Sequence, residues 1–117
     1  MPNYIRNFEP GGTYFFTVNA LVRDDNDLFV KNFELLRDAF ARVRSQRPFS
    51  VVAWVVLPEH LHCIWTLPPG ESDYPARWRA IKSSFSRSLD VDEFRNSSRQ
   101  SRNERGIWQR RYMEHTI

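Results

Sequence analysis

Two histidines, His60 and His62, lie one residue apart in the apolar segment VVLPEHLHCIWTLP, which runs from Val55 to Pro68. Alternate residues of a β-strand point to opposite faces, so both imidazoles are expected side by side on one face. Two neutral imidazoles at this spacing can bind one cation, and a working metal site usually adds a third protein ligand and water. The pair is therefore a candidate metal site. The simpler alternative is that two histidines end a strand and hydrogen-bond to their neighbours.

Other classes of protein with a His-x-His pattern fit this segment poorly. A histidine-triad hydrolase requires a third histidine at position 64, which is Ile64, and a cupin requires a nearby glutamate, whereas the next one is Glu71. Glu59 precedes His60 and either orients its ring or is an exposed turn residue. Cys63 points away from the histidines and is expected to be a small core residue.

A small sheet must position the two histidines. Apolar periodicity and turn residues predict, in order, a strand at 11–22, a helix from a capping Asp27 to Pro48, strands at 49–58 and 60–67, a helix capped by Asp73, and a strand at 107–117. The strand at 49–58 is apolar on both faces, which predicts a central strand covered on both sides. The order β-α-β-β-α-β is that of a ferredoxin-like α+β domain with a central antiparallel sheet.

The expected helices carry apolar stripes. The first has Phe29, Phe33, Leu36, Phe40 and Val43, and the second has Trp78, Ile81 and Phe85. Residues 90–106 are rich in Ser, Asn and Arg and have little periodicity, which predicts a mobile basic loop.

Composition limits the chain to one domain, residues 1–117. It is 41% hydrophobic and 15% aromatic, enough for one core and too short for two domains. The single cysteine cannot form an internal disulfide and the start of the chain has no apolar signal core, so a cytoplasmic protein is expected. No apolar run approaches the ~20 residues of a membrane helix, so no membrane partner is expected.

Positive charge is concentrated in the second part of the chain. Residues 1–76 contain seven basic and nine acidic residues, a net charge of −2, whereas residues 77–117 contain ten and five, a net charge of +5. A polyanion such as nucleic acid is the natural partner for such a region, although arginine-rich surfaces also serve solubility alone.

Four segments of the chain together resemble one family. They are GGTYFFTVN, RPFSVVAWVVLPEHLHCIWTLP, RWRAIKSSFSR and GIWQRRYMEH, in this order. They resemble the REP-associated tyrosine transposases, relatives of the single-tyrosine insertion-sequence transposases in the His-hydrophobic-His nuclease superfamily. The resemblance extends from about Tyr4 to Ile117.

The resemblance implies a DNA transposase that acts on single-stranded or hairpin DNA. In this family a tyrosine attacks a phosphodiester and leaves a 5′-phosphotyrosine link and a free 3′-hydroxyl, assisted by a divalent cation. His60 and His62 match the metal ligands of the family, and Mg²⁺ or Mn²⁺ is the implied cofactor.

The resemblance also implies a missing part. In family members the last strand is followed by a helix that carries the nucleophilic tyrosine and the third metal ligand, whereas this chain stops at Ile117. We therefore expect a chain truncated before its tyrosine helix and inactive on its own. Tyr112, near His115, is the alternative nucleophile, although its position beside a Trp-Gln-x-Arg strand favours packing. The apolar surface left uncovered would favour a homodimer.

Basic residues in the two segments at 77–87 and 106–115 are candidates for DNA contact. They are Arg77, Arg79 and Lys82 in the second helix and Arg110 and Arg111 in the last strand. Tyr14, Phe15 and Phe16 could stack on unpaired bases, although core packing is the better explanation. Two alternative functions stay open: an inactive remnant that still binds hairpin DNA, and an RNA-binding ferredoxin-like module that uses Tyr14 and Phe16.

Overall fold

One antiparallel sheet and three helices make up the described part of the chain. The computed structural model describes residues 8–21, 27–96 and 107–117, with only the backbone for 90–96. In order, the elements are β1 (Thr13–Asn19), α1 (Leu28–Lys31), α2 (Phe33–Gln46), β2 (Ser50–Val56), β3 (His60–Thr66), α3 (Tyr74–Asn96) and β4 (Met113–Thr116). The strands pair in the order β2-β3-β1-β4. The predicted ferredoxin-like α+β fold is confirmed.

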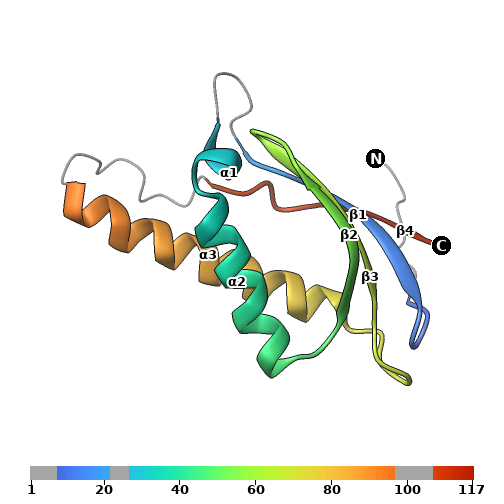
Figure 1. Ribbon diagram of the computed structural model, residues 1–117. Coiled ribbons are helices and arrows are strands. Elements are labelled where there is room, and N and C mark those ends of the chain that lie inside the picture. The colour runs from blue at the N-terminus through green and yellow to red at the C-terminus, as the bar shows by residue number, and fades with distance from the viewer. Residues whose placement is uncertain (1–7, 22–26, 97–106) are drawn as a thin grey trace.

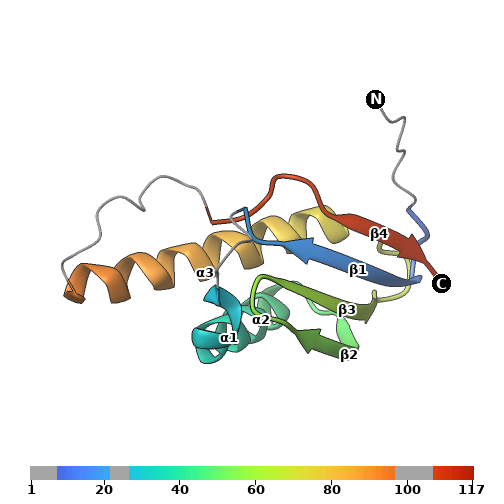
Figure 2. The same ribbon diagram turned by 90° about the horizontal axis from the view of Figure 1, so that it is seen from above.

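The helices lie on one side of the sheet (Figure 1, Figure 2), and no described helix covers the other side. Every second side chain of β1 and β3 is buried against the helices. The buried side chains are Tyr14, Phe16 and Val18 of β1 and Leu61, Cys63 and Trp65 of β3. Cys63 therefore lies in the core, and the two histidines lie on the opposite, partly exposed face.

α3 supplies the centre of an aromatic core. Its first turn is capped by Asp73, whose Oδ1 accepts a hydrogen bond from the backbone N–H of Ala76 at 3.0 Å, as the sequence predicts. The predicted stripe of Trp78, Ile81 and Phe85 is buried. The indole of Trp78 stacks on Trp65 of β3, with ring centres 4.5 Å apart. This packing holds α3 against the strand that carries the histidines.

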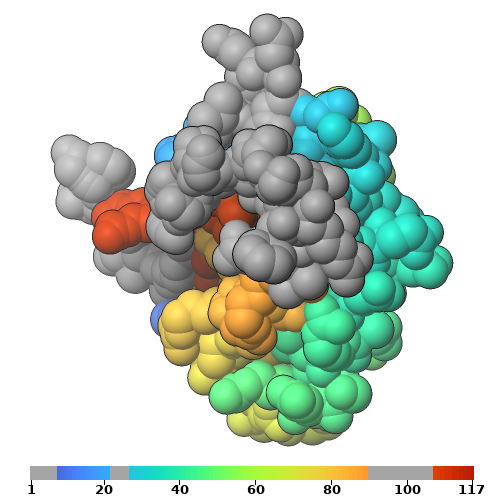
Figure 3. All heavy atoms as spheres, turned by 90° about the vertical axis from the view of Figure 1, so that its left-hand side faces the viewer, coloured from blue at the N-terminus to red at the C-terminus, as the bar shows by residue number. Residues whose placement is uncertain are grey.

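α2 and α3 lie side by side on the helix face of the molecule (Figure 3). α2 buries Leu36, Ala39, Phe40 and Val43. The guanidinium of Arg42 donates hydrogen bonds across the helix pair, to Oγ of Ser84 at 3.0 Å and Oγ of Ser88 at 3.4 Å. The two helices therefore form one layer.

The first predicted helix is broken in two at Asn32. This residue has φ −112° and ψ 35°, outside the helical range, and separates α1 from α2. Its Nδ2 donates a hydrogen bond to the carbonyl of Leu28 at 3.0 Å, so the side chain competes with the helical backbone. The predicted cap at Asp27 is wrong, because that side chain makes no capping hydrogen bond. Phe33 of the predicted stripe is only partly buried.

β2 is an edge strand, and the prediction of a central strand covered on both faces is wrong. It pairs with β3 alone. Val52 and Val55 are 61% and 55% exposed. A continuous apolar run is typical of strands buried on both faces, but which strand occupies the edge is decided by pairing with distant segments.

α3 is longer than predicted, and the last strand is shorter. Residues 90–96 of the predicted loop belong to α3, and 97–106 lie outside the described residues. β4 begins only at Met113, while Trp108 forms an isolated bridge with Ala20 of the segment after β1. Within the described ranges, no helix is long and apolar enough to cross a membrane.

Candidate functional site

His60 and His62 lie on the sheet face that no described helix covers. They alternate along β3 with the buried Leu61 and Cys63. Their ring centres are 5.0 Å apart, and the ring planes meet at 83°. The two imidazoles are therefore neighbours, as the two-residue period of a strand predicts.

Each imidazole has a polar partner at Nδ1. Oε2 of Glu59 lies 3.2 Å from Nδ1 of His60, and Oγ1 of Thr17 lies 3.0 Å from Nδ1 of His62. The ring of Phe15 stacks on His62, with centres 5.5 Å apart and planes inclined by 16°. Nε2 is thus the nitrogen that each ring can offer to a ligand.

The spacing of the two rings fits a shared divalent cation. A cation about 2.1 Å from an imidazole nitrogen lies about 3.2 Å from the ring centre, so two rings that share it have centres within about 6.5 Å of each other. The observed 5.0 Å meets this condition. No group of three His, Cys, Asp or Glu side chains among the described residues could hold a metal. A cation at this pair would therefore have only the two imidazoles as ligands among the described residues.

His115 lies on the histidine face but too far away to join the pair. It is exposed on β4, opposite Phe15 of β1, whereas His62 of β3 is opposite Thr17. Because β1 lies between them and neighbouring strands are about 4.8 Å apart, β4 and β3 are about 10 Å apart. His115 is thus a natural control for experiments on the pair.

Three of the predicted DNA-contact residues are exposed. They are Arg79 on α3 and Arg110 and Arg111 in the segment before β4. The structure leaves their guanidinium groups at the surface, where they can meet a phosphate.

Lys82 is partly buried and connects α3 to the segment before β4. Its Nζ donates a hydrogen bond to the carbonyl of Gln109 at 3.1 Å. The same ammonium lies 5.7 Å from the ring centre of Trp108 and 5.1 Å from that of Tyr112. Its charge therefore also stabilises the protein itself through cation–π contacts.

Two curated proteins match the whole of this chain. The REP-associated tyrosine transposase of Escherichia coli strain K12 is 43% identical over 117 residues, which cover all of this chain and 62% of that protein. A Haemophilus influenzae protein with the same family name is 37% identical over 120 residues, covering all of this chain and 66% of that protein. This chain belongs to the REP-associated tyrosine transposase family. It spans less than two thirds of the length of either relative.

Solved structures agree with the assignment to the REP-associated tyrosine transposases. One is a transposase of this family bound to a REP hairpin, with a TM-score of 0.84 and 42% identity over all of this chain and 62% of that one. Another, from Deinococcus radiodurans, has a TM-score of 0.68 at 18% identity, covers 84% of that chain, and shows the fold alone. No family model matches the chain.

The tyrosines that the structure describes are all buried on the helix side, away from the histidines. Tyr14 and Tyr74 are fully buried, and Tyr112 is 9% exposed. Burial raises the pKa of the Tyr14 hydroxyl, which donates a hydrogen bond to the carbonyl of Glu9 at 2.7 Å. Tyr112 packs against Trp78, with ring centres 5.8 Å apart. None of these three tyrosines therefore lies beside the two histidines.

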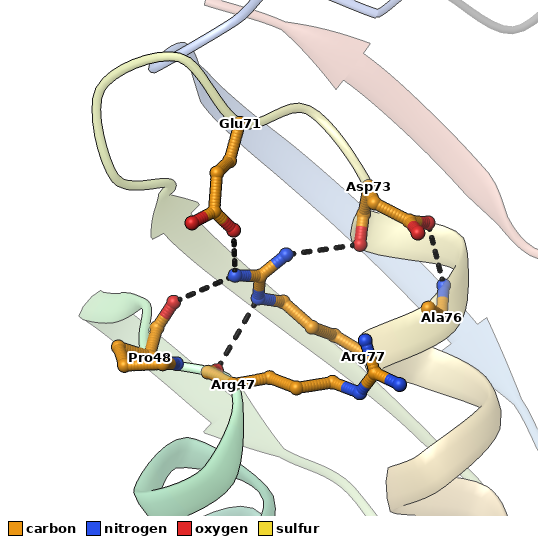
Figure 4. A network of polar contacts seen from close by, with 6 residues as sticks. All are labelled: Arg47, Pro48, Glu71, Asp73, Ala76 and Arg77. Carbon is orange, nitrogen blue, oxygen red and sulfur yellow. Dashed lines mark hydrogen bonds and ion pairs between the residues drawn. The ribbon is translucent and has the colours of Figure 1, made fainter.

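Arg77 is a structural residue, which corrects its assignment to DNA contact. The side chain is 2% exposed. Figure 4 shows its guanidinium enclosed by the loops before β2 and α3. It donates hydrogen bonds to Oε1 of Glu71 at 2.6 Å and to the carbonyls of Pro48, Asp73 and Arg47 at 3.0, 3.1 and 3.3 Å. These contacts leave no surface for a phosphate.

The aromatic residues of β1 divide between the two faces. Tyr14 and Phe16 are fully buried, so they cannot stack on bases, and the RNA-binding module that required them is excluded. Phe15 lies on the histidine face.

Thr17 is a site residue that the sequence did not reveal. It is the cross-strand partner of His62, 45 residues away. The sequence indicates only that Thr17 lies on the same face of its strand as Phe15. Its contact with His62 depends on the register between the two strands, which the tertiary structure sets.

Proposed function

We propose that this chain is the DNA-binding and metal-holding part of a transposase that cuts and rejoins single-stranded or hairpin DNA. The observation that carries the proposal is the pair of adjacent imidazoles on β3, in a chain whose whole length matches REP-associated tyrosine transposases. The solved relative is bound to a REP hairpin, which supports the same class of DNA as the ligand here.

In this proposal His60 and His62 hold a divalent cation, Mg²⁺ or Mn²⁺, through Nε2. Such a cation polarises a phosphodiester and offsets the charge that develops on the leaving oxygen. Two imidazoles alone bind such an ion weakly, because hard cations prefer several oxygen ligands. Phosphate oxygens of bound DNA are suited to complete the site.

The proposed nucleophile is a tyrosine hydroxyl that reaches the histidine face. Its oxygen attacks phosphorus and the bond to the 3′ oxygen breaks, which leaves a 5′-phosphotyrosine link and a free 3′-hydroxyl. Because Tyr14, Tyr74 and Tyr112 are buried on the other side of the sheet, we place this nucleophile outside the described residues. Without a positioned nucleophile the reaction loses a proximity effect of roughly 7–11 kcal/mol.

Exposed arginines supply the proposed contacts to DNA phosphates. Arg79, Arg110 and Arg111 are at the surface, in a region with twice as many basic as acidic residues. Each phosphate that such a residue neutralises releases counterions, so binding weakens as the salt concentration rises. Lys82 contributes positive charge near the same segment.

A second candidate is a protein that binds hairpin DNA and does not cut it. The burial of Tyr14, Tyr74 and Tyr112 away from the histidines favours this candidate, because none of these three tyrosines faces the histidine pair. Both candidates require hairpin binding, and only the first requires bond cleavage.

Fluorescence anisotropy with a labelled REP hairpin tests DNA binding. We expect the hairpin to bind more tightly than a fully paired duplex of equal length, and the affinity to fall at least about tenfold between about 50 mM and about 200 mM salt. Equal affinity for hairpin and duplex, or binding that does not respond to salt, would contradict the proposal.

A titration with Mn²⁺, followed by electron paramagnetic resonance, tests the metal site. His62→Ala is expected to abolish the weak binding, and His115→Ala, which removes an exposed histidine from the same face, is expected to preserve it. Identical titrations for all three proteins would remove the metal from the proposal and leave DNA binding as the function.

A further inference from the structure

We propose that Glu59 and Thr17 are positioning residues: each holds a proton at Nδ1 of one histidine and thereby keeps Nε2 of both rings open to the same cation. This inference rests on the proposed metal site and adds to it the residues that prepare the ligands. The starting observations are the Nδ1 contacts, 3.2 Å for His60 and 3.0 Å for His62.

The contact of Glu59 decides the tautomer of His60. An ionised carboxylate only accepts hydrogen bonds, so neutral His60 must carry its proton at Nδ1 to bond with Oε2. The lone pair of this imidazole is then at Nε2, the nitrogen that a metal requires. Neutral imidazole in water favours the opposite tautomer, with the proton at Nε2. Glu59 therefore reverses the intrinsic preference of the ring.

The position of Glu59 is itself fixed by the fold. Its carbonyl accepts a hydrogen bond from the backbone N–H of Ala20, at the end of β1, at 2.9 Å. The carbonyl of the next residue, His60, accepts one from Leu57 at 2.8 Å. Both the carboxylate and the imidazole are only 22% exposed, which limits competition by water for their contact.

Thr17 plays the corresponding part for His62 from the neighbouring strand. Thr17 and His62 are directly opposite each other in the register of β1 and β3, so their hydrogen bond joins two neighbouring strands. A hydroxyl can accept or donate. A cation at Nε2 of His62 requires the arrangement in which Thr17 accepts from Nδ1–H, and Phe15 stacked on the ring limits its rotation.

Known histidine metal sites indicate how much metal affinity is lost when such an acceptor is removed. The imidazole that binds a metal usually donates its other N–H to a carboxylate, carbonyl or similar acceptor, and loss of that acceptor weakens metal affinity by about 10- to 100-fold. We expect Glu59→Ala to fall in this range. Glu59→Gln keeps an acceptor oxygen and is expected to lose less.

The first test reads the tautomers directly, without a metal. Long-range ¹H–¹⁵N correlation spectra of the 117-residue chain at about pH 8.5, above the ordinary histidine pKa of about 6.5, are expected to show the proton of His60 at Nδ1. Glu59→Ala is expected to shift it toward Nε2, while Glu59→Gln retains it at Nδ1. An unchanged tautomer in Glu59→Ala would overturn the inference, because the carboxylate would then not determine the position of the proton.

The second test measures Mn²⁺ affinity in a matched threonine series. Thr17→Val removes the acceptor and is expected to weaken binding by about 10-fold or more, whereas Thr17→Ser restores it. Thr13→Val is the control, since Thr13 lies on the same strand and face but bonds to Thr66, at 2.8 Å. Equal affinities in Thr17→Val and Thr13→Val would overturn the role of Thr17.

The two tests separate this inference from the proposed function. Wild-type protein that binds no Mn²⁺ but shows the Nδ1–H tautomer, lost in Glu59→Ala, would contradict the metal site and support the positioning role. Wild-type protein that binds Mn²⁺ with no effect of Glu59→Ala or Thr17→Val would support the metal site and overturn the positioning role.

Discussion

Phe15 lies nearly parallel to His62, with a ring-centre distance of 5.5 Å and an interplanar angle of 16°. The two residues come from adjacent strands and share the face without a described helix. An aromatic ring in this position restricts rotation of the imidazole and shields one of its sides from water. The stack is thus a packing contact that acts on a candidate metal ligand.

Replacement of Phe15 should weaken metal binding. An aromatic pair contributes about 0.5–1.5 kcal/mol beyond the burial of its surface, so Phe15→Ala is expected to weaken Mn²⁺ binding by about 2- to 10-fold. Phe15→Tyr keeps the ring and is expected to bind like the wild type. Isothermal titration of the three proteins measures the effect, and equal affinities for all three would show that the stack does not order His62.

Removal of Arg77 should destabilise the fold without a specific effect on DNA binding. Arg77→Ala removes a buried guanidinium and its charged hydrogen bonds to the carbonyls of Arg47 and Pro48, so the free energy of unfolding is expected to fall by about 2–3 kcal/mol. Arg77→Lys keeps a charge but not the planar fork, and should be intermediate. Urea unfolding measures the change, with the exposed Arg79→Ala as control, expected within about 0.5 kcal/mol of wild type.

A loss in Arg79→Ala as large as that in Arg77→Ala would refute the distinction between a buried structural arginine and an exposed one.

Arg110 should contribute one phosphate contact. Arg110→Ala is expected to reduce the slope of log affinity against log salt concentration by about one for a REP hairpin. Arg37→Ala is the control, because Arg37 is exposed on α2 and pairs with Glu34 at 2.8 Å. Anisotropy titrations at several salt concentrations give both slopes. A reduction in Arg37→Ala and none in Arg110→Ala would place the DNA on a different surface.

Cys63 should make the fold less stable in alkali. Burial raises the pKa of its thiol far above the usual range, whereas the unfolded chain ionises near pH 8.5. The buried thiol of Cys63 therefore makes its full contribution to the free energy of unfolding below about pH 8.5. This contribution declines as the pH rises further, because only the unfolded chain then loses the thiol proton. We expect a loss of about 1 kcal/mol between about pH 7.5 and about pH 9.5.

Urea unfolding of wild type and Cys63→Ala at both pH values checks this. The alanine variant should show a smaller decline with pH, and an equal decline in both proteins would assign the pH dependence to other groups.

The three tyrosines that the structure describes should form no covalent adduct with DNA. A tyrosine must reach the histidine face to attack a phosphate there, and Tyr14, Tyr74 and Tyr112 are buried on the opposite side. Incubation with a REP hairpin and Mn²⁺, then denaturing gel electrophoresis and mass spectrometry, provides the measurement. An adduct that maps to Tyr112 would show that this residue leaves the core and is the nucleophile.

Local patterns in the sequence determined the features that depend on few neighbours. The two-residue period of a strand places His60 and His62 on one face and Cys63 on the other, whatever the strand pairs with. The cap at Asp73 and the stripe from Trp78 to Phe85 depend only on helical geometry. The family followed from the same segments, because their residue types were sufficient to match its members along the whole chain.

Only the tertiary structure decided the features that depend on segments far apart in the chain. Thr17 meets His62 because of the register between β1 and β3, and a shift of one residue would place another side chain there. Arg77 is buried because the loops before β2 and α3 close around it. β2 is at the edge because β1 pairs with β3 and β4 instead. Sequence periodicity describes one element at a time, whereas burial and partners are set by the elements that pack against it.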